Sequence, residues 1–299
     1  MNYLLHLLIY LDIYIIVALS LNIVVGYCGL LTLAHAGYFA VGSYAYALLT
    51  LKLGWGFLPS VAAAAILSGT LSLAVSLPAW RLREDFFVMA SLSVQALIFS
   101  AINNWSKPGE PVGTLANLTN GPYGVPGVPR PDIMGSVFDT IGSVATISLV
   151  LAFLNLLVGW ALLKSPWGRV LQAMRDDELA ARGLGKNVRR LKVQAFAVAC
   201  GMVAVAGALY ASYVNYVDAS LSSLDHSILM LSMVIVGGVG NFRGPVVGAA
   251  VLIAIPEIMR LLQIPDTMAA EIRLMAYGLL LIVMMHLRPQ GLAGSYRME

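Results

Sequence analysis

Long apolar stretches are the feature that most constrains what this chain can fold into. A helix that crosses the hydrocarbon core of a bilayer needs about 20 predominantly apolar residues. Nine segments are candidates: 3–24, 28–51, 58–80, 86–104, 136–163, 193–216, 227–241, 245–262 and 270–287. Segment 227–241 is short for a full crossing, so a half-helix or a re-entrant segment is an alternative there. The sequence predicts an all-α polytopic integral membrane protein with about eight or nine transmembrane helices.

The scarcity of charge favours an embedded bundle over a soluble domain. Charged residues make up 11% of the 299 residues and hydrophobic ones 59%, with a mean hydropathy of +0.83. A soluble domain carries about 25% charged residues. The apolar segments leave no room for a separate soluble domain, so we expect one transmembrane domain over residues 1–299. Residues 1–24 lack the basic region and cleavage site of a signal peptide and are interpreted as a retained first span.

Net charge and cysteine content exclude several other classes of protein. A net charge of +3 is too small to indicate nucleic-acid binding. The chain has two cysteines, Cys28 and Cys200, which are too few and too isolated for a disulfide framework or a zinc site. Both lie in apolar segments, so we expect them to pack as small hydrophobic residues. The sequence predicts no metal site.

Basic residues concentrate in the loop 164–192, and this asymmetry predicts the orientation of the chain. The loop holds Lys164, Arg169, Arg175, Arg182, Lys186, Arg189, Arg190 and Lys192. Cytoplasmic loops are enriched in Lys and Arg, so we place this loop in the cytoplasm and assign the other loops by alternation. The same side then receives Arg81, Arg83, Arg243, Arg288 and Arg297. Of the 18 Lys and Arg residues, Lys52, Lys107, Arg130, Arg260 and Arg273 fall elsewhere, which leaves thirteen inside. The N-terminus is then external and the C-terminus cytoplasmic.

Proline and glycine dominate the loop 105–135, which this topology places outside. It contains Pro108, Pro111, Gly121, Pro122, Gly124, Pro126, Gly127, Pro129 and Pro131. Residues of these two types interrupt helices and favour turns. We therefore expect a rigid, turn-rich surface loop rather than a helix.

The cytoplasmic loop carries the signals of short, ordered helices. Ser165 followed by Pro166 is typical of a helix start. Asp176 is expected to cap a second short helix over 177–184.

Two later residues delimit that second helix. Gly185 suits the left-handed position just after a helix, and Asn187 can cap the next helix as it enters the membrane. Two interpretations stay open. The loop is either a basic segment that sets topology or holds anionic lipid, or a docking surface for a cytoplasmic partner.

Glycines interrupt two apolar segments, in corresponding parts of the two halves of the chain. The first, 22–46, contains Asn22, Gly26, Gly29, Thr32, His35, Gly37, Gly42 and Ser43, and the second, 234–249, contains Gly237, Gly238, Gly240, Asn241, Arg243, Gly244, Pro245 and Gly248. Such a pair of interrupted segments indicates a transport pathway. The four-residue spacing of Gly240, Gly244 and Gly248 is also typical of close helix packing, and both interpretations can hold together.

Three ionisable residues within or near the spans are further candidates. His35 is either a gate or substrate contact or a hydrogen-bonded structural residue. Asp12 and Glu257 are acids in apolar segments, which makes them functional candidates by default. Glu257 lies one turn from Arg260 and is expected to pair with it as the simpler alternative.

Four motifs, in order along the chain, carry a resemblance to a known family. They are Gly26-Tyr27-Cys28-Gly29-Leu30-Leu31-Thr32-Leu33-Ala34-His35-Ala36-Gly37, the external stretch from Leu118 to Pro131, Gly237-Gly238-Val239-Gly240-Asn241-Phe242-Arg243-Gly244-Pro245, and Arg288-Pro289-Gln290-Gly291-Leu292. Together with the cytoplasmic loop they resemble permease subunits of the branched-chain (Liv-type, hydrophobic) amino-acid class of ABC importers. They span nearly the whole chain.

The resemblance implies a type II importer-like permease fold in the bacterial cytoplasmic membrane, a second homologous permease, two cytoplasmic ATPases that use ATP and magnesium, and an external binding protein. Branched-chain or related amino acids are the implied substrates, and related permeases serve urea, amides and aromatic acids. The resemblance assigns ATPase coupling to Arg175, Asp177, Glu178, Ala181, Gly183 and Gly185. The candidate substrate pathway comprises Asn22, Gly26, Gly29, Thr32, His35, Gly37, Ser43, Gly237, Gly238, Gly240 and Asn241.

The absence of catalytic motifs bears on whether the chain is an ATPase, another enzyme or a transporter subunit. The chain has no phosphate-binding loop, so ATP hydrolysis would belong to other subunits. It has no zinc-protease motif and no nucleophile elbow, and we predict that it is not an enzyme. An ion-coupled secondary transporter that acts without ATPases is the other hypothesis, and Asp12 and Glu257 would then be its essential acids.

Overall fold

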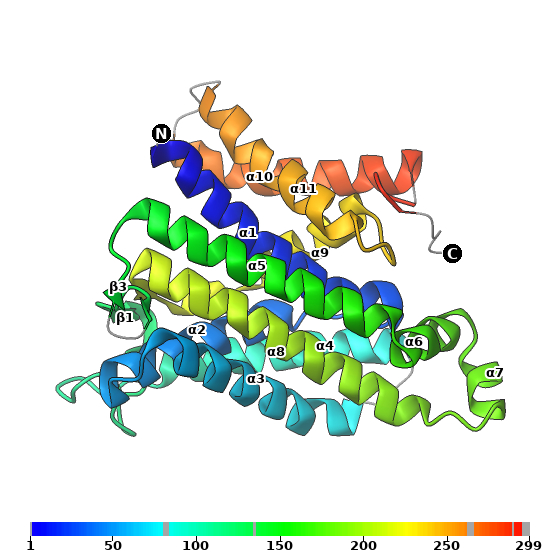
Figure 1. The fold of residues 1–299 in the computed structure, drawn as a ribbon, viewed down its shortest axis with the longest axis horizontal. Helices are drawn as coiled ribbons and strands as arrows, with labels where there is room; N and C mark the ends of the chain where they lie inside the picture. Colours follow the sequence, from blue (N-terminus) through cyan, green and yellow to red (C-terminus); the bar gives the residue numbers. More distant parts are fainter. Residues whose placement is uncertain (1, 80–83, 134–135, 262–265, 289, 295–299) are drawn as a thin grey trace.

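Each of the nine apolar segments overlaps a helix in the computed structural model of the chain (Figure 1). The helices are α1 (Asn2–Asn22), α2 (His35–Leu53), α3 (Phe57–Ala79), α4 (Glu84–Asn104), α5 (Ile141–Lys164), α8 (Val188–Val214), α9 (Leu224–Gly237), α10 (Gly244–Leu261) and α11 (Asp266–Leu287). The structure describes residues 2–79, 84–133, 136–261, 266–288 and 290–294. The predicted cytoplasmic residues Arg81, Arg83 and Arg297, and Pro289 of the last motif, lie outside these ranges.

Four stretches within the described residues are long and apolar enough to cross a membrane. They are Tyr3–Tyr27, Phe86–Asn104, Ile141–Lys164 and Val188–Val214. Phe57–Leu73 and Leu224–Gly237 are shorter apolar helices. The chain is thus a mostly helical membrane protein, and the count of eight or nine crossings stays a prediction.

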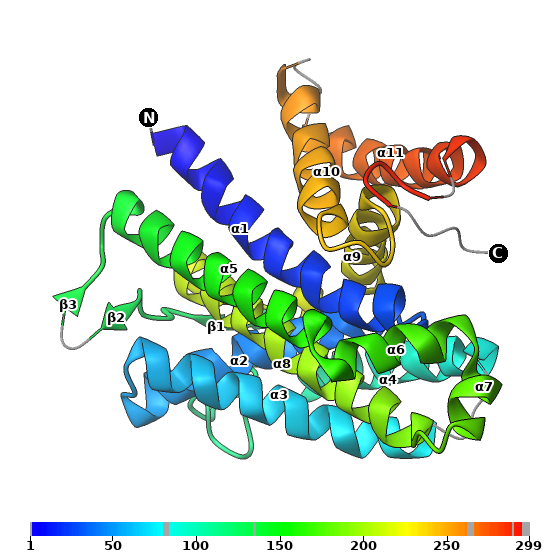
Figure 2. The same cartoon turned by 45° about the vertical axis from the view of Figure 1, so that its right-hand side comes forward.

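Two central helices organise the bundle. α8 packs against α2, α3 and α1, and α1 also packs against α5, α9 and α10. Figures 1 and 2 show the result as layers, with α9, α10 and α11 on one side of α1 and with α8, α2 and α3 on the other. Ile13 and Ile16 of α1 and Leu209 of α8 are fully buried at the centre.

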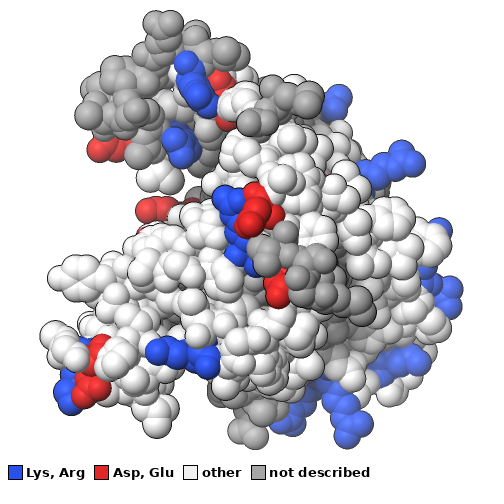
Figure 3. Space-filling model, turned by 60° about the vertical axis from the view of Figure 1, so that its left-hand side comes forward, with Lys and Arg blue, Asp and Glu red and all other residues white. Residues whose placement is uncertain are grey.

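The peripheral helices expose apolar side chains. Leu97 of α4 is 69% exposed and Phe153 of α5 is 61% exposed. Figure 3 shows broad uncharged surface between scattered charged side chains. Such surface is favourable against lipid or another apolar subunit and costly against water.

The two long loops lie at opposite ends of the bundle (Figure 1). The Pro/Gly loop lies at one end and contains η2 (Gly121–Tyr123), β1 (Val125–Pro126) and β2 (Asp132–Ile133). β1 pairs antiparallel with β4 (Tyr216–Val217), Val125 opposite Val217, and β2 pairs with β3 (Ser136–Val137). The short helices α6 (Pro166–Asp176) and α7 (Glu178–Gly183) lie at the other end. A short 3₁₀ turn, η3 (Ala219–Ser222), precedes α9.

Two helices start later than the apolar stretches indicate. The segment 28–51 becomes helical only at His35, because Gly29 has a left-handed backbone (φ 77°) and turns the chain away from the preceding helix. The segment 136–163 becomes helical at Ile141, because Ser136–Val137 pair as a strand and Thr140 then caps the helix. Both late starts follow from backbone turns and strand pairing, which the hydrophobicity of the sequence does not indicate.

The capping residues of the cytoplasmic loop are as predicted, with one shift. Ser165 caps α6, with Pro166 as its first residue. Gly185 has a left-handed φ of 75°, and Asn187 accepts a hydrogen bond from the Arg190 N–H at the start of α8. The cap of α7 is Asp177, which accepts from the Ala180 N–H at 2.9 Å, so the prediction of Asp176 was wrong by one residue. Asp176 instead ends α6.

Candidate functional site

The first glycine-rich segment begins where α1 changes its winding. Residues Ile23–Tyr27 form a single wide π-turn, η1, directly after α1. Such turns inside helices frequently mark functional positions. Gly26 lies in this turn, and a Cβ atom there would come within 2.5 Å of the backbone nitrogen of Gly240. Gly26 therefore allows the first half of the chain to touch the backbone of the second.

The second glycine-rich segment forms a turn between two tightly packed helices. α9 ends at Gly237, and α10 starts at Gly244. A Cβ atom on Gly248 would overlap the Met233 carbonyl oxygen, so this glycine serves close packing of α10 on α9. Gly238 and Gly240 have positive φ angles of 115° and 75°, which let the chain reverse toward η1. The packing interpretation thus holds for Gly248, and Gly240 has a different role.

Asn22 joins the two segments with its side-chain amide. It is fully buried; its Oδ1 accepts from the Gly240 N–H at 3.0 Å, and its Nδ2 donates to the Asn241 carbonyl at 2.9 Å. Asn241 in turn donates to the Ala293 carbonyl. The N–H groups of Leu292 and Ala293 donate to the end of α9 at 2.9 Å each. The first, third and fourth motifs therefore meet in one hydrogen-bonded junction.

Arg175 of α6 inserts into the same junction. Its Nη1 donates to the Gly26 carbonyl at 2.6 Å, and its Nε and Nη2 donate to Asp176 Oδ1 at 3.0 and 2.9 Å. The Arg175 side chain is only 12% exposed. A Cβ atom on either Gly29 or Gly240 would collide with this side chain. A residue assigned to ATPase coupling thus directly contacts residues assigned to the pathway.

The other pathway candidates lie buried in the core around α2. His35 Nε2 lies 2.8 Å from Ser20 Oγ, and Thr32 accepts from the Ala34 N–H. The Gly37 N–H donates to Gln95, and Ser43 donates to the Gly207 carbonyl. His35, Thr32 and Ser43 are thus hydrogen-bonded within the chain, and their assignment to a substrate pathway stays a prediction.

The two acids singled out in the sequence have different surroundings. Asp12 is 7% exposed and accepts a hydrogen bond of 2.7 Å from Ser148 on α5. Glu257 makes no hydrogen bond or ion pair among the described residues, and its expected pairing with Arg260 is absent there. The Arg260 guanidinium lies instead over the Tyr3 ring, 4.9 Å from its centroid. Arg260 thus makes a cation–π contact with Tyr3 in place of the expected ion pair.

The remaining coupling candidates form the α6–α7 surface. Ala181 is buried, whereas Gly183 and Gly185 are exposed. Glu178 binds Lys192 of α8 at 2.8 Å and also pairs with Arg182. Burial raises the pKa of the Glu178 carboxyl, but the hydrogen bond and charge of Lys192 and the charge of Arg182 outweigh it, so the pKa lies below its ordinary value.

Two apolar residues on this surface were missed by the sequence analysis. Leu179 is 78% exposed and Leu184 is 80% exposed, both beside the charged groups of α7. Exposed leucines on a short polar helix are typical of a protein contact. The sequence did contain a signal for this contact surface, because both leucines stand in an otherwise polar loop.

Cys28 and Cys200 are free and buried, as expected for packing residues.

The bundle and its junction define a class of protein, a polytopic membrane permease with broken glycine-rich segments. The chain belongs to the family of permease components of branched-chain amino acid transport systems, whose sequence model matches residues 3–285. No solved structure matches the chain significantly.

Named relatives support this assignment. The chain is 30% identical over 304 residues to the high-affinity branched-chain amino acid transport system permease protein LivM of Escherichia coli (strain K12), covering 94% of this chain and 67% of that protein. It is 26% identical over 329 residues to a probable branched-chain amino acid transport permease protein LivM of Methanocaldococcus jannaschii, covering 95% and 91%. A shorter match, 31% over 134 residues, covers 43% of this chain and 38% of the autoinducer 2 import system permease protein LsrC of Salmonella typhimurium.

Proposed function

We propose that this chain is the membrane-spanning subunit of an ATP-driven ABC importer for branched-chain or related amino acids. Relatives whose sequences match nearly the whole chain are named as branched-chain amino acid permeases. The family match favours this function over ion-coupled secondary transport. The chain supplies the pathway, and separate subunits bind ATP and magnesium.

The proposed assembly contains a second homologous permease, two cytoplasmic ATPases and an external binding protein that delivers the substrate. In the bacterial cytoplasmic membrane, α6 and α7 face the cytoplasm and the Pro/Gly loop faces outward. The opposite positions of these two loops in the bundle support this orientation (Figure 1). The start of α1 at the Pro/Gly-loop end is consistent with an external N-terminus.

The observation that carries the proposal is the bond between Arg175 and the Gly26 carbonyl. A movement of α6 displaces the Arg175 guanidinium, which lies between η1 and the Gly238–Gly240 turn. Both broken segments are held to each other by Asn22, so they receive the displacement together. ATPase closure would thereby reach the two segments through one side chain.

Reconstitution into proteoliposomes tests the proposed function. The chain, its partner permease, the ATPases and the binding protein should together take up labelled leucine only when ATP is present on the cytoplasmic face. Omission of the ATPases or of the binding protein should abolish uptake. Uptake by this chain alone, driven by a proton or sodium gradient, would overturn the proposal.

A further inference from the structure

Two adjoining cavities lie along one face of α1, from the Pro/Gly-loop end toward the middle of the bundle. The outer one has a volume of about 530 Å³ and the inner one about 490 Å³. Leu7, Tyr10 and Glu257 line both, so the cavities share a wall. None of the pathway candidates predicted from the sequence lines either cavity. Both volumes fall within the usual range for small-molecule sites.

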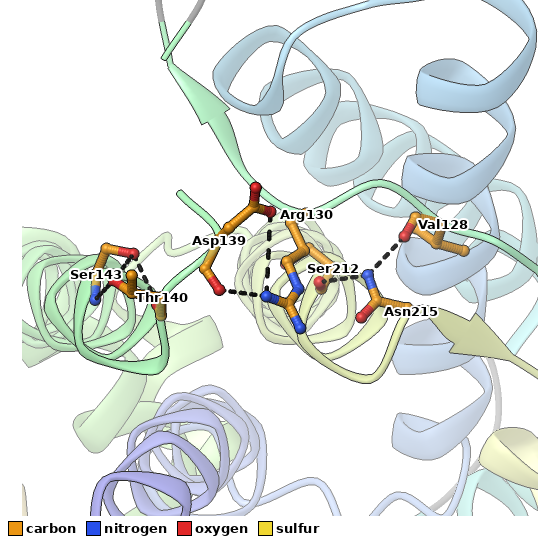
Figure 4. Close-up of polar contacts among 7 residues, drawn as sticks. All are labelled: Val128, Arg130, Asp139, Thr140, Ser143, Ser212 and Asn215. Carbon is orange, nitrogen blue, oxygen red and sulfur yellow. Dashed lines mark hydrogen bonds and ion pairs between the residues drawn. The ribbon is translucent and has the colours of Figure 1, made fainter. Parts of the chain in front are cut away.

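The outer cavity opens at a rigid, polar rim. Arg130 pairs with Asp139 of the Pro/Gly loop end, and Asn215 donates to the Val128 carbonyl at 2.8 Å (Figure 4). Thr140 and Ser143 bond to each other at the start of α5. These contacts hold the loop against the ends of α5 and α8.

Aromatic side chains form the wall between the rim and the interior. Tyr10 packs edge-on against Tyr213, with ring centroids 5.6 Å apart, and also against Tyr210. His6 bonds to the Tyr213 hydroxyl. The wall is therefore fixed by ring packing, and Tyr10 separates the two cavities.

The inner cavity combines three charged side chains, two acidic and one basic, with a largely apolar lining. Glu257 of α10 and Arg273 of α11 both line it. Neither side chain makes an ion pair or a hydrogen bond among the described residues, so the two lie farther apart than an ion pair. The apolar lining consists of Leu7, Leu229, Met233, Leu252, Ile253, Pro256 and Leu274. A second acid, Asp225, lies with His226 at the start of α9, and Tyr10, Tyr14 and Tyr277 complete the lining.

This arrangement matches one class of ligand. Glu257 is half-buried and Arg273 is exposed, so both charged groups are open to a ligand that enters the cavity. An aliphatic α-amino acid brings an ammonium, a carboxylate and a branched apolar side chain in one molecule. Each of these groups has a counterpart on the cavity wall.

We propose that the inner cavity is a transit site for aliphatic α-amino acids, in which Glu257 binds the ammonium and Arg273 the carboxylate. The apolar lining receives the side chain, and the outer cavity is the entrance. This inference rests on the proposed function and names the place where the substrate passes through this subunit.

Uptake by the complete reconstituted transporter provides the first test. Glu257→Gln and Arg273→Gln should each lower leucine uptake roughly tenfold or more, since each loses a charged hydrogen bond to the substrate. ATP hydrolysis stimulated by the binding protein should persist. Glu271→Gln is the matched control, an exposed acid on α11 outside both cavities, and should keep full uptake. If the wild type transports leucine and both cavity variants match the control, the inference is wrong. A wild type that fails to transport would instead contradict the proposed function.

Thiol protection provides a second test that does not depend on transport. Cys28 and Cys200 are buried, so an Ile253→Cys variant should be the main site of reaction with a water-soluble maleimide. Leucine should slow the reaction at least several-fold, whereas 4-methylpentanoate, which lacks the ammonium, and isoamylamine, which lacks the carboxylate, should not. Equal protection by all three compounds, or by none, would overturn the inference.

Discussion

The guanidinium of Arg175 donates a hydrogen bond of 2.6 Å to the backbone carbonyl of Gly26, across 149 positions of sequence. The donor lies on a short helix at the end of the bundle, and the acceptor lies in the π-turn that interrupts the first apolar segment. A surface helix is thereby connected to the packed interior by a charged hydrogen bond, which is stronger than a neutral one.

Replacement of Arg175 should uncouple ATP hydrolysis from transport. Arg175→Lys keeps the charge but loses the planar fork that places separate N–H donors on the Gly26 carbonyl and on Asp176. We expect leucine uptake by the reconstituted complex to fall about tenfold while ATP hydrolysis continues. Arg169→Lys, on an exposed part of the same helix, is the control. Equal uptake by the two variants would exclude the proposed role of Arg175.

Replacement of Gly26 by alanine should destabilise the junction. The added Cβ atom would lie 2.5 Å from the Gly240 nitrogen, which belongs to the backbone and cannot rotate away. Overpacking of this kind costs about 1–3 kcal/mol. Gly142→Ala adds the same atom on α5 with no neighbour within 4 Å. Thermal unfolding in detergent should give a lower Tm for Gly26→Ala than for Gly142→Ala, and similar Tm values would contradict this account.

Polar substitution of the exposed leucines should weaken ATPase attachment and leave the fold intact. Leu179→Asp and Leu184→Asp change side chains that are 78% and 80% exposed, so they disturb no core packing. We expect the ATPase to co-purify at less than wild-type yield with either variant. Leu115→Asp, at a residue 88% exposed in the opposite loop, should retain it. Loss of the ATPase in all three variants would instead indicate a general effect of added negative charge.

Acidification should loosen α7 from α8 through Glu178. The folded pKa of this carboxyl is depressed by Lys192 and Arg182, so its pairing stabilises the fold above the ordinary pKa, about 4.3. That stability is lost as the pH falls through the lower folded value. The protection of α7 amides against hydrogen exchange, corrected for the intrinsic exchange rate at each pH, should therefore fall as the carboxyl becomes protonated. Glu178→Gln should already show the lower protection at pH 7 and little further change in protection on acidification.

Local signals in the sequence were sufficient for the helices and most of their caps. Apolar length placed α1 and α8, and Ser165, Gly185 and Asn187 marked the turns of the cytoplasmic loop correctly. The cap of α7 shifted by one residue because Asp176 and Asp177 are adjacent and chemically identical, and only the end of α6 distinguishes them.

The contacts between distant segments could not be obtained in this way. The glycine motifs indicated two interrupted segments, but their meeting at Asn22 and Arg175 depends on how whole helices pack. Spacing on α10 favoured an ion pair between Glu257 and Arg260, whereas the Tyr3 ring of another helix attracts the arginine instead. The inner cavity joins residues of four helices, and no local pattern contains that information.

The acceptor at Gly26 belongs to the main chain, and this has a consequence for genetics. No substitution at position 26 removes the backbone carbonyl oxygen that accepts this hydrogen bond. A substitution can only shift the backbone that carries the oxygen. Substitutions at position 26 would therefore report crowding and never the loss of the bond itself. Only a substitution of Arg175 removes a partner of this hydrogen bond. Suppressor mutations of a defective Arg175 variant should therefore lie in the helices that position the backbone of residue 26.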